Sequence, residues 1–155
     1  MSESPPDPLM PAAKEMLRIV RTTFRLQGAI LRHGDELFSS SGLSSSRVQV
    51  IVALRDGPRT VPEIARGMGL TRQGVQRTVH VLTKEGLLET KKNPEHKRSS
   101  LIYLTPKGRR RLLRVTVSRN RFLNDWSREH QAGDLKQLAD LIEQLDIEME
   151  QYAQH

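Results

Sequence analysis

The chain has no cysteine among its 155 residues. This absence excludes disulfide bonds, switches based on thiol oxidation and metal sites built from thiolates. Aromatic residues make up only 4% of the chain, and no apolar run approaches the ~20 residues of a membrane-spanning helix. The first residues, MSESPPDPLMP, lack the basic-then-apolar order of a signal peptide. We therefore expect a cytoplasmic protein with no membrane partner.

Sequence signatures of enzymes are missing as well. The chain contains no Gly-rich phosphate loop, no nucleophile elbow and no pair of carboxylates in an apolar setting. The five histidines, His33 among them, show no spacing typical of metal ligands. We expect no catalytic residues, no metal and no cofactor, and hence no enzyme.

Basic charge is concentrated in one third of the chain. The net charge is +7, and residues 66–111 hold twelve Lys or Arg against three acids. Residues 134–155 hold one Lys against six acids. A local basic excess is what a surface that binds a polyanion needs. Basic charge can also serve solubility alone, but charge placed at random would rarely gather in one segment.

Two short helices joined by a tight turn are predicted between residues 60 and 86. Thr60 and Glu63 have the spacing of a capping box, which marks the start of the first helix. Gly69 can take the positive φ that ends this helix, and Thr71 can cap the next one. Gly86 ends the second helix. This arrangement is typical of a helix-turn-helix.

The second of these helices has an apolar side and a polar side. Val75, Val79 and Leu82 recur at helical spacing and form the apolar stripe. In the major groove Arg can pair with guanine and Gln with adenine, and a helix start can hold a phosphate. Exposed helices also carry Arg and Gln for solubility, so the argument depends on the segment that follows. The residues predicted to bind DNA from this helix are Thr71, Arg72, Gln73, Gln76, Arg77 and His80.

A β-hairpin with a basic tip is predicted directly after this helix. Along residues 87–92, Leu88, Thr90 and Lys92 alternate with Leu87, Glu89 and Lys91. Asn93-Pro94 marks a turn, and residues 101–104 form a β-prone return strand. A narrow minor groove attracts Arg through its negative potential. A charged hairpin can also merely keep a sheet edge soluble, but its position after a helix-turn-helix favours a DNA-contacting wing. The wing residues predicted to bind DNA are Lys97, Arg98 and Ser99.

Long helices are predicted on both sides of this region. Ser44 is expected to cap a support helix with an apolar run to Leu54. Near the other end, Gly133 breaks the helical pattern, and Asp134 is expected to cap the last helix. The predicted divisions are a disordered tail at 1–8, an N-terminal dimerisation helix at 9–38, the winged helix-turn-helix at 44–105 and C-terminal dimerisation helices at 106–155.

Apolar seams at both ends of the chain indicate a helical interface between two copies. The seam of the last helix alternates steps of three and four, with acids outside it. These helices could instead cover their own core, but they extend far past a small winged domain. A two-fold dimer predicts half-sites on DNA roughly 34 Å apart. The predicted dimerisation residues are Leu17, Phe24, Leu138, Ile142, Leu145, Met149 and Tyr152.

The first helix also carries a second, weaker series of basic residues. Its members are expected to be solvated or paired with acids, and not to bind DNA. The series consists of Arg18, Arg21, Arg25 and Arg32.

The central region resembles the winged helix-turn-helix of the MarR (multiple antibiotic resistance regulator) family of transcription factors. The matching features are Gln76-Arg77, the segment LTKEGL at 82–87, the wing NPEHKR at 93–98 and Leu104-Thr105. The family usually has Asp where this chain has His96, and that Asp is thought to brace the wing. The resemblance implies a mainly α fold with a small β-hairpin wing, flanked by long dimerisation helices.

The resemblance also implies a function. MarR relatives are homodimers that bind a nearly palindromic operator in double-stranded DNA, and they usually act as repressors. Many release DNA when a small aromatic or phenolic effector enters a pocket between the dimer helices and the winged domain. The alternative is a DNA-binding protein that needs no ligand, or one that coats DNA. Weak, salt-dependent binding without sequence preference would mark an architectural protein.

Overall fold

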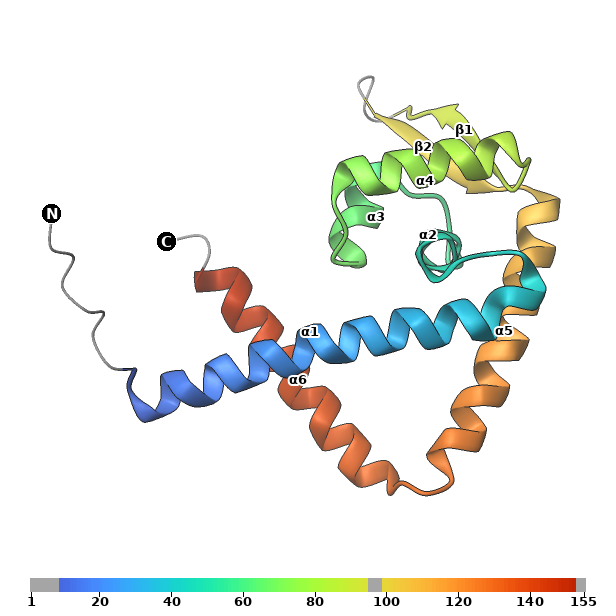
Figure 1. The fold of residues 1–155 in the computed structure, drawn as a ribbon. Coiled ribbons are helices and arrows are strands. Elements are labelled where there is room, and N and C mark those ends of the chain that lie inside the picture. Colours follow the sequence, from blue (N-terminus) through green and yellow to red (C-terminus); the bar gives the residue numbers. More distant parts are fainter. Residues whose placement is uncertain (1–8, 95–98, 153–155) are drawn as a thin grey trace, which may run out of the picture. The chain divides into compact units, whose positions relative to one another are not determined.

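The computed structural model describes residues 9–94 and 99–152. The fold is mainly α with one two-stranded antiparallel sheet, as the sequence predicted (Figure 1). The chain divides into two compact units at residue 115. The elements are α1 (Pro11–Phe38), the 3-10 turn η1 (Ser39–Ser41), α2 (Ser45–Ala53), α3 (Val61–Gly67), α4 (Arg72–Lys84), β1 (Leu88–Lys92), β2 (Ser100–Leu104), α5 (Pro106–Ser127) and α6 (Ala132–Tyr152).

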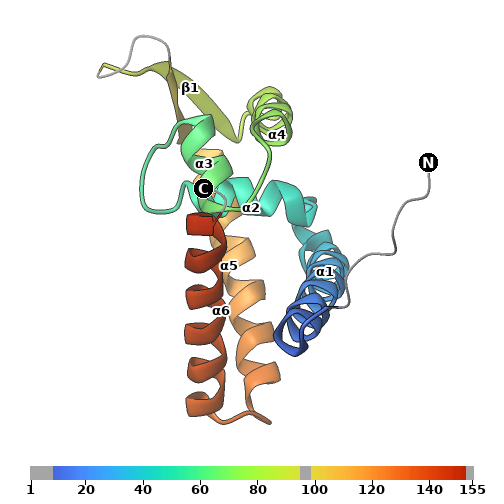
Figure 2. The ribbon, with the colours of Figure 1, turned by 90° about the vertical axis from the view of Figure 1, so that its left-hand side faces the viewer.

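The core of the first unit lies among α2, α3, α4 and the hairpin. The three helices pack against one another, and α4 also packs against β1 (Figure 2). Burying these apolar side chains supplies most of the driving force for folding this unit, at about 25 cal/mol per Å² removed from water. The side chains with the least exposure are Val50, Ile51, Ile64, Val75, Leu82, Leu87, Leu88 and Val115.

A third segment, around Arg59, pairs with the hairpin, and the sequence analysis did not predict this pairing. β1 and β2 pair with Leu88 opposite Leu104 and Lys92 opposite Ser100. The N–H of Arg59 donates to the carbonyl of Ile102 at 3.3 Å, and the N–H of Ile102 donates to the carbonyl of Arg59 at 2.9 Å. This bridge ties the segment before α3 to β2, which therefore lies between that segment and β1.

The support helix α2 begins differently from the sequence prediction. Ser44 occupies the N-cap position, but its hydroxyl makes no capping hydrogen bond. The carboxylate of Asp35 in α1 caps the helix instead, because it accepts from the N–H of Ser45 at 2.6 Å. The hydroxyl of Ser45 donates to the carbonyl of Leu31 at 2.8 Å. A side chain on Gly34 would collide with Ser45, so glycine permits this close approach.

Hydrogen bonds fix the start of α5 to the end of α4. The hydroxyl of Thr105 accepts from the N–H of Gly108 at 3.0 Å and lies 2.7 Å from the carbonyl oxygen of Gly86. Lys107 donates to the carbonyl of Glu85 at 2.8 Å. These bonds hold the first turn of α5 against the base of the winged domain.

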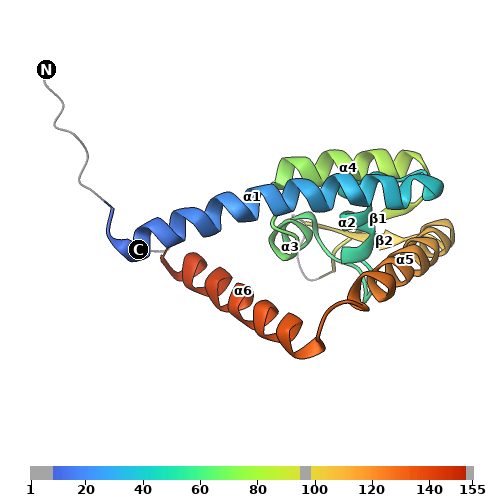
Figure 3. The same ribbon diagram turned by 60° about the horizontal axis from the view of Figure 1, so that its bottom comes forward.

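The second unit contains the later part of α5 and all of α6. Figure 3 shows these two helices diverging from the turn that connects them. The predicted break between two helices is present, but it lies at residues 128–131 and not at Gly133. α6 begins at Ala132, and the carbonyl of Gln131 accepts the first helical bond, from Leu135. Asp134 therefore lies inside the first turn, where an acid suits the helix dipole, and does not cap the helix. No helix within the described residues is long and apolar enough to cross a membrane.

Candidate nucleic-acid interface

The turn between α3 and α4 is built from local signals in the sequence. Thr60 and Glu63 form the predicted capping box at the start of α3. After the helix, Gly69 has a φ of 60°. The N–H of Leu70 donates to the carbonyl of Ala65 at 2.9 Å, and the N–H of Gly69 donates to the carbonyl of Arg66 at 3.4 Å. These two bonds form a Schellman motif, which turns the chain sharply into α4.

The two ends of α4 are fixed in the same way. The hydroxyl of Thr71 accepts from the N–H of Gly74 at 3.1 Å and caps the start. At the other end Gly86 has a φ of 71°, and the N–H of Leu87 donates to the carbonyl of Leu82 at 2.9 Å. The helix is thus limited to Arg72–Lys84, which leaves a short rod anchored at both ends.

α4 presents one polar face to the exterior. Val75, Val79 and Leu82 are almost fully buried against the core, as predicted. The buried stripe fixes the rotation of the helix about its axis, so the opposite side must face outward. The six residues predicted to bind DNA from this helix are all exposed: Thr71, Arg72, Gln73, Gln76, Arg77 and His80.

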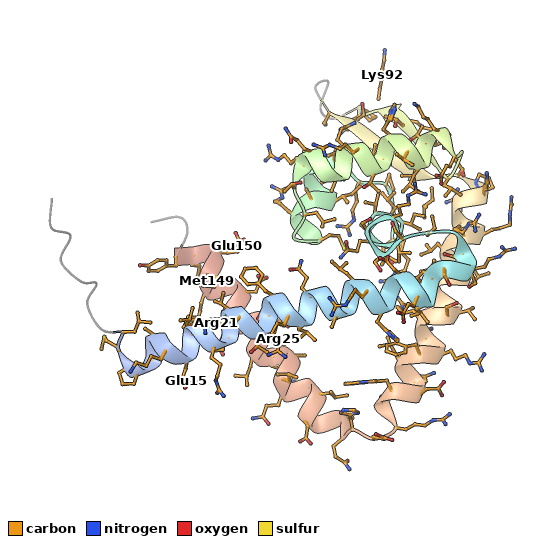
Figure 4. All side chains as sticks on the ribbon, in the orientation of Figure 1. Glu15, Arg21, Arg25, Lys92, Met149 and Glu150 are labelled. Carbon is orange, nitrogen blue, oxygen red and sulfur yellow. The ribbon has the colours of Figure 1, made fainter. Side chains whose placement is uncertain are left out.

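The hairpin adds basic groups beside α4. Lys91 lies 4.8 Å from the ring centroid of Tyr103 and 2.9 Å from the carboxylate of Glu89. These contacts hold Lys91 on the sheet. Lys92 is exposed at the end of β1 and projects away from the hairpin (Figure 4). Neither lysine was among the predicted contact residues, although their place at the end of the predicted strand could have suggested it.

The base of the wing is closed by a polar contact. The amide of Asn93 donates to the hydroxyl of Ser99 at 3.2 Å. Ser99 therefore helps to close the base of the wing, and a direct role in DNA binding stays a prediction. The other two predicted wing residues, Lys97 and Arg98, lie outside the described residues.

A shallow hollow of about 290 Å³ lies between α4 and the hairpin. Gln76 lines one side of it, and Thr90, Ser99 and Ser100 line the other. The polar face of α4 and the side of the hairpin that carries Thr90, Ser99 and Ser100 are therefore parts of one surface. A surface of this kind can follow a groove and the adjoining backbone of a nucleic acid.

Two acids near this surface, Glu63 and Glu85, have fixed partners. Hydrogen bonds from the backbone and the hydroxyl of Thr60 lower the pKa of the Glu63 carboxyl below its ordinary value. Arg47 of α2 forms an ion pair of 2.9 Å with Glu85 at the end of α4. The acids close to α4 are thus engaged in holding the fold. No cluster of three or more metal-binding side chains occurs in the described part of the chain.

The residues predicted to form the dimer interface lie on α1 and α6. Leu17, Phe24, Leu138, Ile142, Met149 and Tyr152 are exposed in a single copy, and Leu145 is half-buried. Large exposed apolar side chains in regular rows are typical of an interaction surface. Dimerisation itself stays a prediction at this point.

Comparison with known proteins identifies the family. A MarR family model matches residues 41–99. An uncharacterised protein of Mycobacterium tuberculosis is 40% identical over 102 residues, which cover 66% of this chain and 71% of the relative. The matched family segment contains α2, α3, α4 and the first strand of the wing.

Solved structures with the same fold extend this comparison to the flanking helices. A mutant of MarR from Escherichia coli, complexed with operator DNA, has a TM-score of 0.74 and 19% identity, covering 84% of this chain and 95% of that chain. BpsR of Bordetella bronchiseptica, whose DNA binding is regulated by 6-hydroxynicotinic acid, has a TM-score of 0.65 and 18% identity. The match to BpsR covers 81% of this chain and 98% of that one. At these identities the likeness concerns the fold.

Proposed function

Since this chain belongs to the MarR family of DNA-binding transcription regulators, we propose that it is a homodimeric, sequence-specific repressor. In this proposal two copies bind one nearly palindromic operator in double-stranded DNA. A small-molecule effector then releases the protein from its operator. The family and its structural neighbours are transcription regulators, not enzymes. In bacteria, such a protein works in the cytoplasm with the chromosome.

The main observation that supports the proposal is the exposed polar face of α4. Gln76 and Arg77 lie at the middle of this face, where a helix inserted in the major groove approaches base edges. Thr71 and the free N–H groups of the first turn lie at its start, where a phosphate is favoured. The wing residues Lys97 and Arg98 follow the exposed Lys92 along the chain, which supports contacts on a neighbouring part of the duplex.

The proposed dimer follows from the exposed apolar rows on α1 and α6. A short helix such as α4 contacts only a few base pairs, and two copies double the contacts that discriminate one sequence. Two-fold symmetry then requires an inverted repeat whose half-sites are about 34 Å apart, one turn of the duplex.

The effector is the part of the proposal that rests most on relatives. BpsR responds to 6-hydroxynicotinic acid, a small hydroxylated aromatic acid. We extend this to the class of small aromatic or phenolic compounds. A thermal-shift screen with such compounds tests this part: binding raises the melting temperature, and the same compound should weaken the complex with DNA.

Selection of bound sequences from a random DNA library tests the central proposal. We expect a nearly palindromic consensus with half-sites one helical turn apart. A consensus without symmetry would contradict the homodimer. Recovery of unrelated sequences, bound weakly and with a steep salt dependence, would instead identify a protein that coats DNA.

A further inference from the structure

A row of basic residues on α1 has no role in the proposed contact with DNA. The residues recur at steps of four, three, four and seven, so they share one side of the helix, and all are exposed. Arg18 forms an ion pair of 2.7 Å with Glu15. Arg21 and Arg25 make no hydrogen bond or ion pair with any residue in the described ranges. We call Lys14, Arg18, Arg21, Arg25 and Arg32 the basic stripe.

α6 carries the matching feature with the opposite charge. Glu143, Asp146 and Glu150 recur at steps of three and four, are exposed, and have no partner within residues 9–94 and 99–152. We call these three residues the acidic stripe. Two other acids of α6 are engaged within their own helix: Asp140 pairs with Lys136 at 2.5 Å, and Glu148 accepts from Gln144 at 2.8 Å. Apart from Asp134 in the first turn, the unpaired acids of α6 therefore lie together on one side.

Each stripe runs beside an apolar seam of its own helix. Successive residues of an α-helix turn by ~100°. On that basis each stripe lies roughly 110–120° clockwise from its seam, viewed from the N-terminus of the helix. The seam of α1 contains Met16, Leu17, Val20, Phe24 and Leu31, and that of α6 contains Leu138, Ile142, Leu145, Met149 and Tyr152.

Because both stripes lie clockwise from their seams, only some relative orientations of the two helices can bring the stripes together. When the seams face each other in parallel helices, the two stripes lie on opposite sides of the contact. In antiparallel helices one partner is viewed from its other end, so the stripes come to the same side. Only the antiparallel arrangement joins the apolar rows and the opposite charges at once.

We propose that α1 of one copy packs antiparallel against α6 of a second copy, with the basic stripe facing the acidic stripe. This rests on the homodimer of the proposed function and specifies its orientation, register and electrostatics. The proposed pairs are Arg18 with Glu150, Arg21 with Asp146 and Arg25 with Glu143.

The spacing of the charges supports this register. With a rise of 1.5 Å per residue, Arg18, Arg21 and Arg25 lie at about 0, 4.5 and 10.5 Å along α1. Their partners, taken backwards along α6, lie at about 0, 6 and 10.5 Å. The mismatch of roughly 1.5 Å is well within the reach of an arginine side chain. The same register sets Tyr152 beside Met16, Met149 beside Val20, Leu145 beside Phe24 and Leu138 beside Leu31.

The proposal is tested by reversing the charges of each stripe in a separate variant and then mixing the two variants. One variant carries Arg21→Glu and Arg25→Glu, and a second carries Glu143→Arg and Asp146→Arg. We expect each alone to raise the dimer dissociation constant roughly 10- to 100-fold in sedimentation, because like charges then face each other in both symmetry-related contacts. Mixing the two variants in equal amounts should restore dimers, since both contacts of the heterodimer again join opposite charges.

A matched control uses acids of α6 that already have partners. Asp140→Arg with Glu148→Arg makes the same charge change on the same helix, and we expect the dissociation constant to stay within about threefold. Circular dichroism checks that each variant keeps its helices. If a reversed variant loses them, Arg21→Gln with Arg25→Gln replaces it, with a smaller increase expected in the same direction.

The outcomes separate this inference from the proposed function. A wild-type monomer would overturn the homodimer and this pairing together. Wild-type dimers that survive both reversals would overturn the pairing alone. If mixing fails but a single chain with all four substitutions recovers the wild-type behaviour, the stripes meet within one chain and the inference is wrong.

Discussion

Gly108 at the start of α5 lies so close to the carbonyl oxygen of Leu87 that a side-chain carbon at position 108 would overlap it. Thr105 is hydrogen-bonded to the same carbonyl through its N–H, at 3.1 Å. This junction is where the winged domain continues into the long helix that leaves it. Glycine is therefore required here by space, although the position is helical.

Gly108→Ala should destabilise the fold markedly. The added methyl group meets a backbone carbonyl, which cannot move aside without breaking the junction with Thr105. We expect a loss of about 2 kcal/mol or more in a urea titration. Gly133→Ala is the matched control, because that helical glycine has open space around it. The control should be neutral or stabilising by up to ~1 kcal/mol, and equal losses in both variants would contradict the crowding argument.

The start of α2 gives a second pair of contrasting variants. Asp35→Ala removes the carboxylate that accepts from the N–H of Ser45 and should cost about 1 kcal/mol of stability. Ser44→Ala alters the residue at the N-cap position, whose hydroxyl makes no capping bond, and should cost less than about 0.5 kcal/mol. Urea unfolding of both proteins measures the difference. The reverse order would show that Ser44 caps the helix after all.

The capping box of α3 predicts a weak pH dependence. The pKa of Glu63 is lowered by hydrogen bonds from Thr60, so its ionised form is stabilised in the folded state. The contribution to stability is present above the ordinary glutamate pKa of about 4.3 and is lost as the pH falls through the lower folded value.

Glu63→Gln should therefore be slightly less stable than the wild type at pH 7. Because Glu63 is exposed, we expect a difference well under about 1 kcal/mol. The difference should vanish in acid below the folded pKa. Thermal melts of both proteins between pH 3 and 7 measure it, and a difference that grows in acid would contradict the assignment.

The features that were predicted correctly from the sequence depend on residues that lie close together along the chain. The capping box at Thr60 and the helix ends at Gly69 and Gly86 were predicted, because each involves residues within one turn of the chain. The outward face of α4 was also predicted, since the phase of Val75 and Val79 fixes the opposite side. These signals together were sufficient to predict the winged helix-turn-helix.

The details that the sequence did not give depend on contacts between distant segments. The bridge between Arg59 and Ile102 joins residues far apart in the chain, and no local pattern marks it. The cap of α2 comes from Asp35 in another helix, so the serine-rich segment pointed to the wrong side chain. The wing tip and the dimer contacts stay predictions because they concern residues outside the described ranges or a second copy.

Leu138→Arg should disrupt the dimer. Leu138 is exposed in one copy and belongs to the apolar seam of α6, so a buried charge at this position would have no partner. We expect a shift from dimer to monomer in light scattering at micromolar concentration, together with loss of operator binding. Glu148→Arg, away from the seam, is the control and should stay dimeric. A dimer peak for Leu138→Arg would remove this residue from the interface.

Arg77→Ala should weaken binding to the operator without changing the fold. Arg77 is exposed at the middle of the polar face of α4, where a guanidinium can make two hydrogen bonds to a guanine. We expect a loss of about 1–3 kcal/mol, or roughly 5- to 150-fold in the dissociation constant, in a gel-shift titration.

Arg128→Ala provides a control for the charge change made by Arg77→Ala. Arg128 is exposed in the second unit, after α5, and pairs with Asp125 at 3.2 Å. Its removal should change affinity by less than about twofold, since it lies outside the winged domain. If Arg77 reads a base, its variant should also tolerate substitutions at one operator position that the wild type rejects. Equal weakening on every sequence would mean that Arg77 contacts only phosphate.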